Sequence, residues 1–286
     1  MLECSRGEWC GQAIPWRWCQ SRLMDGIELL PAQRVTGEGR HDIEDPVTEE
    51  LPLTISFNHR GLVTLLCSPK DLNYLAVGFL ATEGLIKKKD ELKRITVDET
   101  KGIVDVETIL VKEKSDRTST RQVVTSGCGR GVSFRDPRDK IVQRKFTSQF
   151  SMSAGQVFAL VKQFLRLSLV YRATGGVHSA ALCDTERVLI FTEDIGRHNT
   201  IDKIWGRCIL EDIPIDDRLI ITSGRVSSEV VLKVARMNIP ILVSKSAPTN
   251  LGVKLANDLE MTLICFVRGS RMNVYSAGWR VVADEQ

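Results

Sequence analysis

Apolar and polar positions alternate with a period of two in the first part of the chain, a pattern typical of half-buried strands. The alternation covers residues 51–57 and returns at 62–67, and the turn-forming stretch Asn58-His59-Arg60-Gly61 separates the two runs. These residues predict a β-hairpin. A helix is expected next, opened by Asp71 and ended near Gly84, with its apolar residues on one face.

Short strands complete this part of the chain. They are expected near residues 93–97, 103–110 and 122–125. A polar stretch at 37–45 precedes the hairpin and predicts a loop. Together these elements indicate a small α+β domain over residues 41–150.

The second part of the chain changes to a helical period. Apolar residues recur at helical spacing between 157 and 165, and Ser153 is the expected N-cap of a helix that runs to residue 170. Short apolar strands then alternate with helices. The expected strands cover 180–183, 188–192, 218–222, 240–244 and 262–267, and the expected helices cover 199–210, 227–237 and 249–259. This alternation predicts an α/β domain over 151–286, with a parallel or mixed sheet covered by helices on both faces.

The first 40 residues are interpreted as an N-terminal extension. Residues 1–23 hold three of the eight cysteines and three of the five tryptophans. They contain no apolar segment of signal-peptide type, and their cysteine spacing lacks the Cys-x-x-Cys of zinc sites. We expect these residues to be loosely packed or disordered, and translation could begin at Met1 or at Met24.

Composition and charge narrow the class of protein. The 286 residues are 43% hydrophobic and 26% charged, which is typical of a globular protein with a core of its own. Lys and Arg number 39 against 36 Asp and Glu, a net charge of +3 that is too near neutral to require nucleic acid or a membrane surface as partner. No apolar run is long enough to span a bilayer. The cysteines follow no disulfide framework, so reduced intracellular thiols are expected.

Four expected strands of the α/β domain end in segments that combine small residues with cations. These segments are 193–199, 223–228, 245–249 and 268–271, and their cations are Arg197, Arg225, Lys245, Arg268 and Arg271. Sheets of this kind bind ligands beyond the carboxyl ends of their strands, and helix starts beside Arg or Lys suit phosphate oxygens. One segment alone is most simply a turn, but four on one edge predict a pocket for an anionic ligand. None matches the P-loop or the dinucleotide fingerprint.

Cys128 stands in the glycine-rich stretch Thr125-Ser126-Gly127-Cys128-Gly129-Arg130-Gly131. Structural cysteines usually lie in apolar runs, as Cys67, Cys183 and Cys265 do here. Glycine neighbours leave the Cys128 thiol accessible, and the nearby Arg130 favours the thiolate. The stretch predicts a nucleophile or sulfur carrier, and a free surface cysteine in a turn is the equal alternative.

Further motifs accompany these segments in chain order. The full set is 76–84 (Ala-Val-Gly-Phe-Leu-Ala-Thr-Glu-Gly), Ser126-Gly127-Cys128-Gly129, 174–181 (Thr-Gly-Gly-Val-His-Ser-Ala-Ala), 193–199 (Glu-Asp-Ile-Gly-Arg-His-Asn) with Asp202 and Lys203, 223–229 (Ser-Gly-Arg-Val-Ser-Ser-Glu), 246–249 (Ser-Ala-Pro-Thr) and 266–271 (Phe-Val-Arg-Gly-Ser-Arg). With these motifs in this order, the chain resembles the formate dehydrogenase accessory sulfurtransferase family of the FdhD/NarQ type over residues 45–276.

The resemblance implies a function and a fold. Members of the family carry sulfur as a cysteine persulfide taken from a cysteine desulfurase, and they deliver it to the molybdenum bis(guanine dinucleotide) cofactor destined for formate dehydrogenase. Cys128 would carry the sulfur here. The resemblance also implies a cytoplasmic homodimer whose C-terminal α/β domain has the three-layer fold of cytidine deaminase. The family's cofactor-binding stretch corresponds to Phe266, Val267, Arg268, Gly269, Ser270 and Arg271, and a guanine nucleotide is the expected surrogate ligand.

The strand ends supply candidate contacts for the phosphates of that cofactor. The candidates are Arg197, Arg225, Lys245, Arg268 and Arg271. His198 opens a helix and could steady a phosphate, poise the persulfide or be a scaffold histidine, whereas His178 is more typical of a scaffold histidine. Glu193 and Asp194 point opposite ways as neighbours on a strand, and we expect them to be loop and capping groups that hold Arg197 and Lys203.

The chain departs from the family in one respect. Many members carry Cys-Gly-x-Cys in the cysteine loop, whereas the second position is Gly131 here. One thiol is enough to carry one sulfur atom, but a disulfide within the loop is excluded. A cofactor-binding chaperone that moves no sulfur is therefore the alternative function. No metal site is expected, because the His-x-Glu and Pro-Cys-x-x-Cys motifs of the zinc deaminases are missing.

Overall fold

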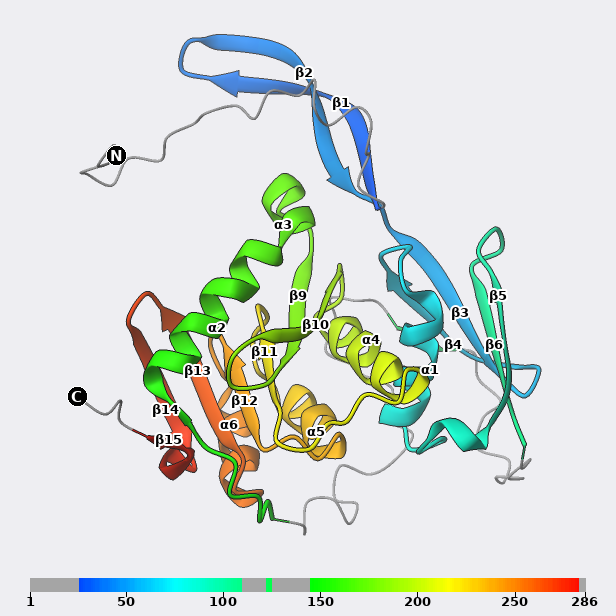
Figure 1. The fold of residues 1–286 in the computed structure, drawn as a ribbon. Coiled ribbons are helices and arrows are strands. Elements are labelled where there is room, and N and C mark those ends of the chain that lie inside the picture. The colour runs from blue at the N-terminus through cyan, green and yellow to red at the C-terminus, as the bar shows by residue number, and fades with distance from the viewer. Residues whose placement is uncertain (1–25, 110–121, 125–144, 283–286) are drawn as a thin grey trace.

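The computed structural model describes residues 26–109, 122–124 and 145–282. The described chain forms two larger sheets with helices against them and a separate two-stranded ribbon (Figure 1). The protein is therefore mixed α/β, as the hydrophobic pattern predicts. Among the helices of these described ranges, none is long and apolar enough to cross a membrane.

The ribbon consists of β1 (Ile27–Thr36) and β2 (Gly39–Thr48), and it projects from the rest of the molecule (Figure 1). The expectation of a loop at 37–45 is wrong, because β2 runs through it. The ribbon also begins within the expected extension 1–40. Most of its side chains are exposed, so no alternation of apolar and polar residues marks it in the sequence. The expected domain boundaries at 40 and 150 stay predictions.

The first larger sheet has the strand order β5-β6-β3-β4-β7. Its strands are β3 (Leu51–Phe57), β4 (Arg60–Cys67), β5 (Leu92–Asp98), β6 (Ile103–Thr108) and β7 (Gln122–Val124), with the 3-10 helix η2 (Lys89–Glu91) before β5. The predicted hairpin is confirmed by the antiparallel β3–β4 pair, and the predicted helix by α1 (Leu72–Thr82). Alternate strand residues such as Leu53 and Ile55 are buried in one core with Leu75 of α1.

The second sheet has the strand order β10-β9-β11-β12-β13-β14. Its strands are β9 (His178–Cys183), β10 (Val188–Asp194), β11 (Leu219–Thr222), β12 (Ile241–Ser244), β13 (Thr262–Arg268) and β14 (Arg271–Ser276). β11, β12 and β13 are parallel, whereas β9 is antiparallel to β10 and β11, and β14 to β13. The predicted mixed sheet is thus confirmed. The last strand, β14, was not expected from the sequence, because half of its residues are polar.

Helices cover both faces of the second sheet. They are α2 (Ala154–Leu167), α3 (Leu169–Thr174), α4 (Arg197–Leu210), α5 (Ser228–Arg236) and α6 (Asn250–Asp258). On one face of the sheet, Val157 and Phe164 of α2 pack in a core with Ile221 and Val243. On the other face, α4 and α5 pack in the second core with the neighbouring strand residues Ile220 and Leu242. The period-two pattern of the strands therefore separates two apolar layers.

The predicted cap of α2 is confirmed. The Ser153 hydroxyl accepts a hydrogen bond from the Gln156 amide at 3.2 Å, and the Gln156 side chain accepts one from the Ser153 amide at 2.8 Å. The helix ends at Leu167 rather than at residue 170, because the backbone leaves the helical region at Ser168 before α3 begins. β8 (Met152–Ser153) pairs with β15 (Val281–Val282), which follows the 3-10 helix η4 (Gly278–Arg280).

Helix α4 joins the two sheets. Lys203 of α4 forms an ion pair with Asp194 at 2.7 Å, and both side chains are fully buried. The neighbouring Asp202 pairs with Lys233 of α5 at 2.6 Å and accepts a hydrogen bond from Thr82 of α1 at 2.7 Å. Adjacent positions on one helix thus bind both halves of the molecule together.

Candidate functional site at the cationic edge of the second sheet

The carboxyl ends of β10, β11, β12 and β13 lie at one edge of the second sheet. β9 is antiparallel to both β10 and β11, so β10 runs in the same direction as the three parallel strands. The four strand-end segments predicted from the sequence therefore do share an edge. We call it the cationic edge and define it by Arg197, His198, Arg225, Lys245, Arg268 and Arg271.

Asp194 organises the turn that leads from β10 into α4. Its carboxylate accepts hydrogen bonds from the backbone amide of Gly196 and from the side chain of Asn199, both at 2.8 Å. A third hydrogen bond, at 3.1 Å, comes from the backbone amide of Ser68, directly after β4. With Lys203 as counter-ion, the buried charge is fully compensated. The turn that carries the first cations of the edge is therefore tied to the first sheet.

Glu193 has a different partner from the one expected. Its carboxylate accepts hydrogen bonds from the backbone amides of Val170 and Tyr171 at the start of α3, both at 3.1 Å. Burial raises the pKa of Glu193, although these hydrogen bonds lower it. The expected capping role is confirmed, and so is the Asp194–Lys203 contact. The expectation that Glu193 and Asp194 also hold Arg197 stays a prediction, because the hydrogen bonds and ion pair found for the two carboxylates in the described chain go to α3, to Ser68, to the turn before α4 and to Lys203.

Polar atoms without partners gather where α4 and α5 begin. Nε of Arg197, both ring nitrogens of His198 and the hydroxyl of Ser227 are buried atoms that make no hydrogen bond within the described chain. Ser227 is the N-cap residue of α5, yet its side chain caps nothing. Buried polar groups in folded proteins are nearly always satisfied, and helix N-termini attract anions. This arrangement fits an anionic ligand such as a phosphate.

The two histidines near this point are neutral at physiological pH. Burial, reinforced by the charges of Lys233 and Arg197, lowers the pKa of His198 to about 3. Burial also lowers the pKa of His178, and the charges of Arg197 and Arg225 lower it further. The contact of 3.5 Å between His198 Nε2 and the carboxylate of Glu229 is therefore not an ion pair at neutral pH. Neutral imidazoles can donate or accept a hydrogen bond at a ligand.

A small hollow lies at the same edge, between the strand ends and helices α2 and α3. Its volume is about 220 Å³. It is lined by Phe164, Leu165, Ser168, Tyr171, Gly175, Gly176, Val177, His178, Ser179, Ile195, Ser223 and Lys245. The Lys245 ammonium lies 5.6 Å from the centre of the Tyr171 ring, a cation–π contact at one side of the hollow.

The residues of the predicted cofactor stretch 266–271 lie in different environments, some in the core and some exposed at a turn. Phe266 adopts a left-handed backbone conformation with φ 55°, where the β13–β14 pairing is interrupted. Val267 is buried against α2, so it belongs to the core. Arg268, Gly269, Ser270 and Arg271 are exposed at the β13–β14 turn. This turn shares the cationic edge but does not line the hollow.

Cys128 lies outside the described residues, as do Cys4, Cys10 and Cys19. The other cysteines, Cys67, Cys183, Cys208 and Cys265, are all buried thiols. Burial raises the pKa of Cys67, Cys208 and Cys265 to about 12 and that of Cys183 further still. These cysteines are therefore poor nucleophiles, as their positions in apolar strands and helices predict.

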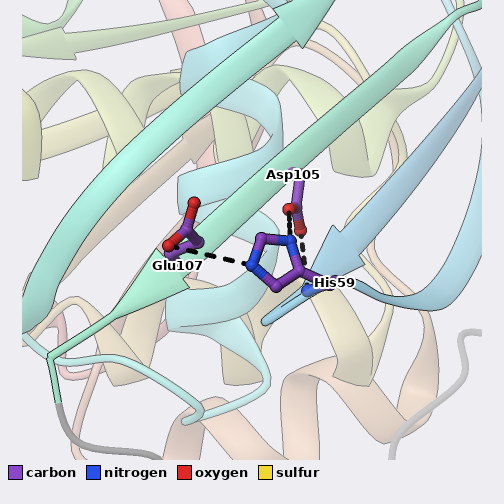
Figure 2. Close-up of side chains that lie close together, drawn as sticks. All are labelled: His59, Asp105 and Glu107. Atoms are coloured by element: carbon purple, nitrogen blue, oxygen red, sulfur yellow. Dashed lines mark hydrogen bonds and ion pairs between the residues drawn. The ribbon is translucent and has the colours of Figure 1, made fainter.

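A separate cluster of His59, Asp105 and Glu107 lies on the first sheet (Figure 2). Nδ1 of His59 is 2.6 Å from the Asp105 carboxylate, whereas Nε2 is 3.8 Å from Glu107, which also binds Lys93 at 3.1 Å. The two ring nitrogens thus face different carboxylates, and a lysine neutralises one of them. The cluster is a network of polar contacts at the β3–β4 turn, at the opposite end of β4 from Cys67 and the cationic edge.

Sequence reasoning missed several residues that build the edge. Ser68, Asn199, Ser227 and Glu229 contribute contacts or unpaired groups, and Tyr171 and Ser223 line the hollow. Most of them lie in the motifs quoted above, so the sequence did contain a signal that they belong to the site. For Ser68 the sequence contained no such signal, because its backbone amide rather than its side chain contacts Asp194.

Known proteins similar to this chain cover most of its length. The profile of the FdhD/NarQ family matches residues 48–282. Proteins named sulfur carrier protein FdhD are similar in Bacillus pumilus (strain SAFR-032), at 42% identity over 83% of this chain and 90% of the relative, and in Bacillus subtilis (strain 168), at 42% over 84% and 91%. The protein of that name from Staphylococcus aureus (strain MRSA252) is 40% identical over 85% of this chain and 91% of its own.

A solved structure also shares the fold. It is a protein of Desulfotalea psychrophila assigned as a formate dehydrogenase accessory protein, which is 26% identical and superposes with a TM-score of 0.73. The match covers 90% of this chain and 99% of that protein. Because the family profile, the relatives and the fold agree over nearly the whole described chain, this protein belongs to the FdhD/NarQ family.

Proposed function

We propose that this protein is a sulfur carrier: Cys128 takes persulfide sulfur from a cysteine desulfurase and delivers it to the molybdenum bis(guanine dinucleotide) cofactor of formate dehydrogenase. The names of its relatives support sulfur carriage, and the name of the similar structure supports formate dehydrogenase as client. The cytidine-deaminase-like layering, the homodimer and the cytoplasmic location belong to the same proposal.

The observation that carries the proposal is the position of β7, which is the last part of the described chain before Cys128. Val124, the last residue of β7, pairs in parallel with Leu65 of β4. The next residue, Leu66, accepts a hydrogen bond of 2.9 Å from the side chain of Asn199 in the first turn of α4. β7 therefore points its carboxyl end toward the cationic edge. Cys128 is four residues beyond Val124, a length of at most about 14 Å of extended chain.

The proposed loading step conserves atoms and electrons. The Cys128 thiolate attacks the outer sulfur of the desulfurase persulfide, so one sulfur–sulfur bond forms as another breaks. The desulfurase thiolate leaves, and Cys128 holds the persulfide. In delivery, the acceptor takes one neutral sulfur atom and the Cys128 thiolate is regenerated.

The cationic edge supplies the binding half of the function. The cofactor is cargo, and its diphosphates are the anions that suit the unpaired groups of Arg197, His198 and Ser227. Arg225 and Lys245 add positive charge beside them. The exposed Arg268 and Arg271 would contact the same large ligand from the β13–β14 turn. A guanine nucleotide should therefore bind as a fragment of the cargo.

The test is to incubate the full chain with a cysteine desulfurase and cysteine and to analyse its peptides by mass spectrometry. We expect a gain of about 32 Da, one sulfur atom, on the Cys128 peptide. Cys128→Ala should lose both the gain and the ability to support active formate dehydrogenase in cells. Cys208→Ala, which removes a buried thiol, is the matched control and should keep both.

One result would favour the chaperone alternative. If Cys128→Ala supported normal formate dehydrogenase activity while the protein still bound guanine nucleotide, sulfur carriage would be refuted and cofactor binding retained.

A further inference from the structure

Asp105 and Glu107 are alternate residues of β6, so their side chains leave the same face of the first sheet. Val106 between them faces the other way and is buried in the core. The two carboxylates are only 20% and 15% exposed. Two negative charges are therefore held close together at a partly covered surface.

The β3–β4 turn places the ring of His59 between these two carboxylates (Figure 2). The turn is fixed to β6 by hydrogen bonds on both sides of the ring. The Asn58 side chain accepts one from the amide of Thr108 at 2.8 Å, and the His59 amide donates one to Asp105 at 3.2 Å. The position of the ring is therefore set by the packing of the turn on the sheet.

The two ring nitrogens of His59 are placed for different roles. Nδ1 lies 2.6 Å from the Asp105 carboxylate, and in the neutral ring this contact puts the proton on Nδ1 and leaves the lone pair on Nε2. Nε2 faces Glu107 at 3.8 Å, which is too long for a hydrogen bond. It is a suitable distance for a shared ion, because a nitrogen and an oxygen that each lie about 2.0–2.2 Å from one metal are about 3–4 Å apart.

Histidines that bind metals have this arrangement, in which the nitrogen away from the ion donates to a carboxylate that fixes the ring. We infer that Nε2 of His59 and the carboxylate of Glu107 bind a divalent transition-metal ion of the zinc type, and that Asp105 orients His59. Imidazole and carboxylate oxygen both suit Zn²⁺. Since His59 is 71% exposed, the other positions of the ion are open to water.

This site is separate from the cationic edge, and the inference does not depend on the proposed sulfur transfer. It also differs from the zinc site of the deaminases, whose motifs the sequence lacks. The two ligands come from a turn and a strand far apart in the chain, so no local motif marks them.

Lys93 competes with the ion for Glu107. Its ammonium lies 3.1 Å from Oε2, the oxygen that also faces His59. Arg94 stands opposite Glu107 in the β5–β6 pairing and adds a second positive charge. An incoming ion must displace the Lys93 ammonium into water, so we expect exchangeable binding. Removal of Lys93 should strengthen it.

The experiment follows the four histidines of the full chain by NMR. Protein labelled with ¹⁵N in histidine is titrated with Zn²⁺ at neutral pH, and the signals of the ring nitrogens are recorded. We expect Zn²⁺ to shift Nε2 of His59 and to leave the rings of His178 and His198 unchanged. Zinc bound by thiols elsewhere in the chain does not produce this shift, and the exposed His41 reports adventitious binding.

Three variants test the assigned roles. Glu107→Gln should weaken zinc binding at His59 about tenfold or more, and Asp105→Asn about ten- to hundredfold, the usual cost of losing the carboxylate behind a ligating histidine. Lys93→Met should strengthen binding by a few-fold, as expected for the loss of one exposed ion pair. Lys101→Met is its matched control, because it removes the lysine of another exposed pair, with Asp98, and should leave zinc binding unchanged.

Three results would overturn the inference. They are a His59 ring that Zn²⁺ leaves unchanged, a shift of His41 as strong as that of His59, and a Lys93→Met variant that binds no more tightly than Lys101→Met. Circular dichroism establishes that each variant is folded. Should Asp105→Asn not fold, Glu107→Gln and Lys93→Met still decide between a metal site and a purely structural cluster.

Discussion

Gly78 of α1 and Gly206 of α4 face each other where the two helices cross. A Cβ atom built on Gly78 would collide with the carbonyl of Asp202, and one built on Gly206 would collide with the carbonyl of Tyr74. The helix backbones are therefore in direct contact at this point. This close approach brings Asp202 within reach of Thr82 and explains why the motif at 76–84 places a glycine in the middle of a helix.

Gly206→Ala should destabilise the protein. The added methyl group meets backbone atoms, which cannot move aside as a flexible side chain would, and overpacking of this kind costs about 1–3 kcal/mol. The better helix propensity of alanine would offset only about 1 kcal/mol of a larger clash. We expect a lower free energy of unfolding in urea titrations, with nucleotide binding retained in the folded fraction.

Gly37→Ala is the matched control for this prediction. Gly37 has open space around its Cβ position and no positive φ, so alanine there should leave the free energy of unfolding unchanged within error. If Gly206→Ala were as stable as this control, the close crossing of α1 and α4 would be wrong.

The sequence predicted the elements whose apolar residues have a clear period. The α2 cap at Ser153 and the parallel strands of the second sheet follow from local pattern alone. The ribbon β1–β2 did not, because its side chains are exposed and show no period. At the site, the cations at the strand ends were visible in the sequence, since topology alone places them on one edge. The contact of Ser68 with Asp194 was not, because a backbone amide carries no residue-specific signal.

His198 should make the stability of the protein depend on pH. Its folded pKa is about 3, below the value near 6.5 of an unfolded histidine. The folded state therefore favours the neutral ring, and the stability this gives is present above about pH 6.5 and is lost as the pH falls toward 3. His178, whose pKa is also lowered, contributes in the same direction.

The free energy of unfolding, measured at intervals between pH 7 and pH 4, checks this dependence. His198→Gln cannot titrate, so its stability should fall less steeply with decreasing pH than that of the wild type. His41→Gln, which replaces an exposed histidine of the ribbon, should keep the wild-type slope. Equal slopes in all three proteins would contradict a neutral buried His198.

The four described cysteines should resist alkylation in the folded protein. Burial raises the pKa of Cys67, Cys208 and Cys265 to about 12, so at pH 8 almost none of these thiols is in the reactive thiolate form. Native labelling with iodoacetamide should leave their peptides unmodified, and the same treatment in guanidinium chloride should modify all four. Labelling of Cys265 in the native state would contradict its position in the core.

The cations of the edge should differ in their contribution to anion binding. Nε of Arg197 is buried and unpaired, so a phosphate there would form a charge-assisted hydrogen bond worth about 1.5–3 kcal/mol. Arg197→Gln should weaken the binding of guanosine diphosphate roughly ten- to hundredfold by the same principle. Arg268 is exposed, and an exposed charge contributes about 0–1 kcal/mol, so Arg268→Gln should weaken binding by a few-fold at most. High salt should increase the difference between the two variants, because salt screens exposed charges more than buried ones. The loss of affinity caused by Arg268→Gln should vanish at high ionic strength, whereas the loss caused by Arg197→Gln should persist. A larger effect of Arg268→Gln than of Arg197→Gln at both salt concentrations would show that the nucleotide binds at the β13–β14 turn rather than where α4 and α5 begin.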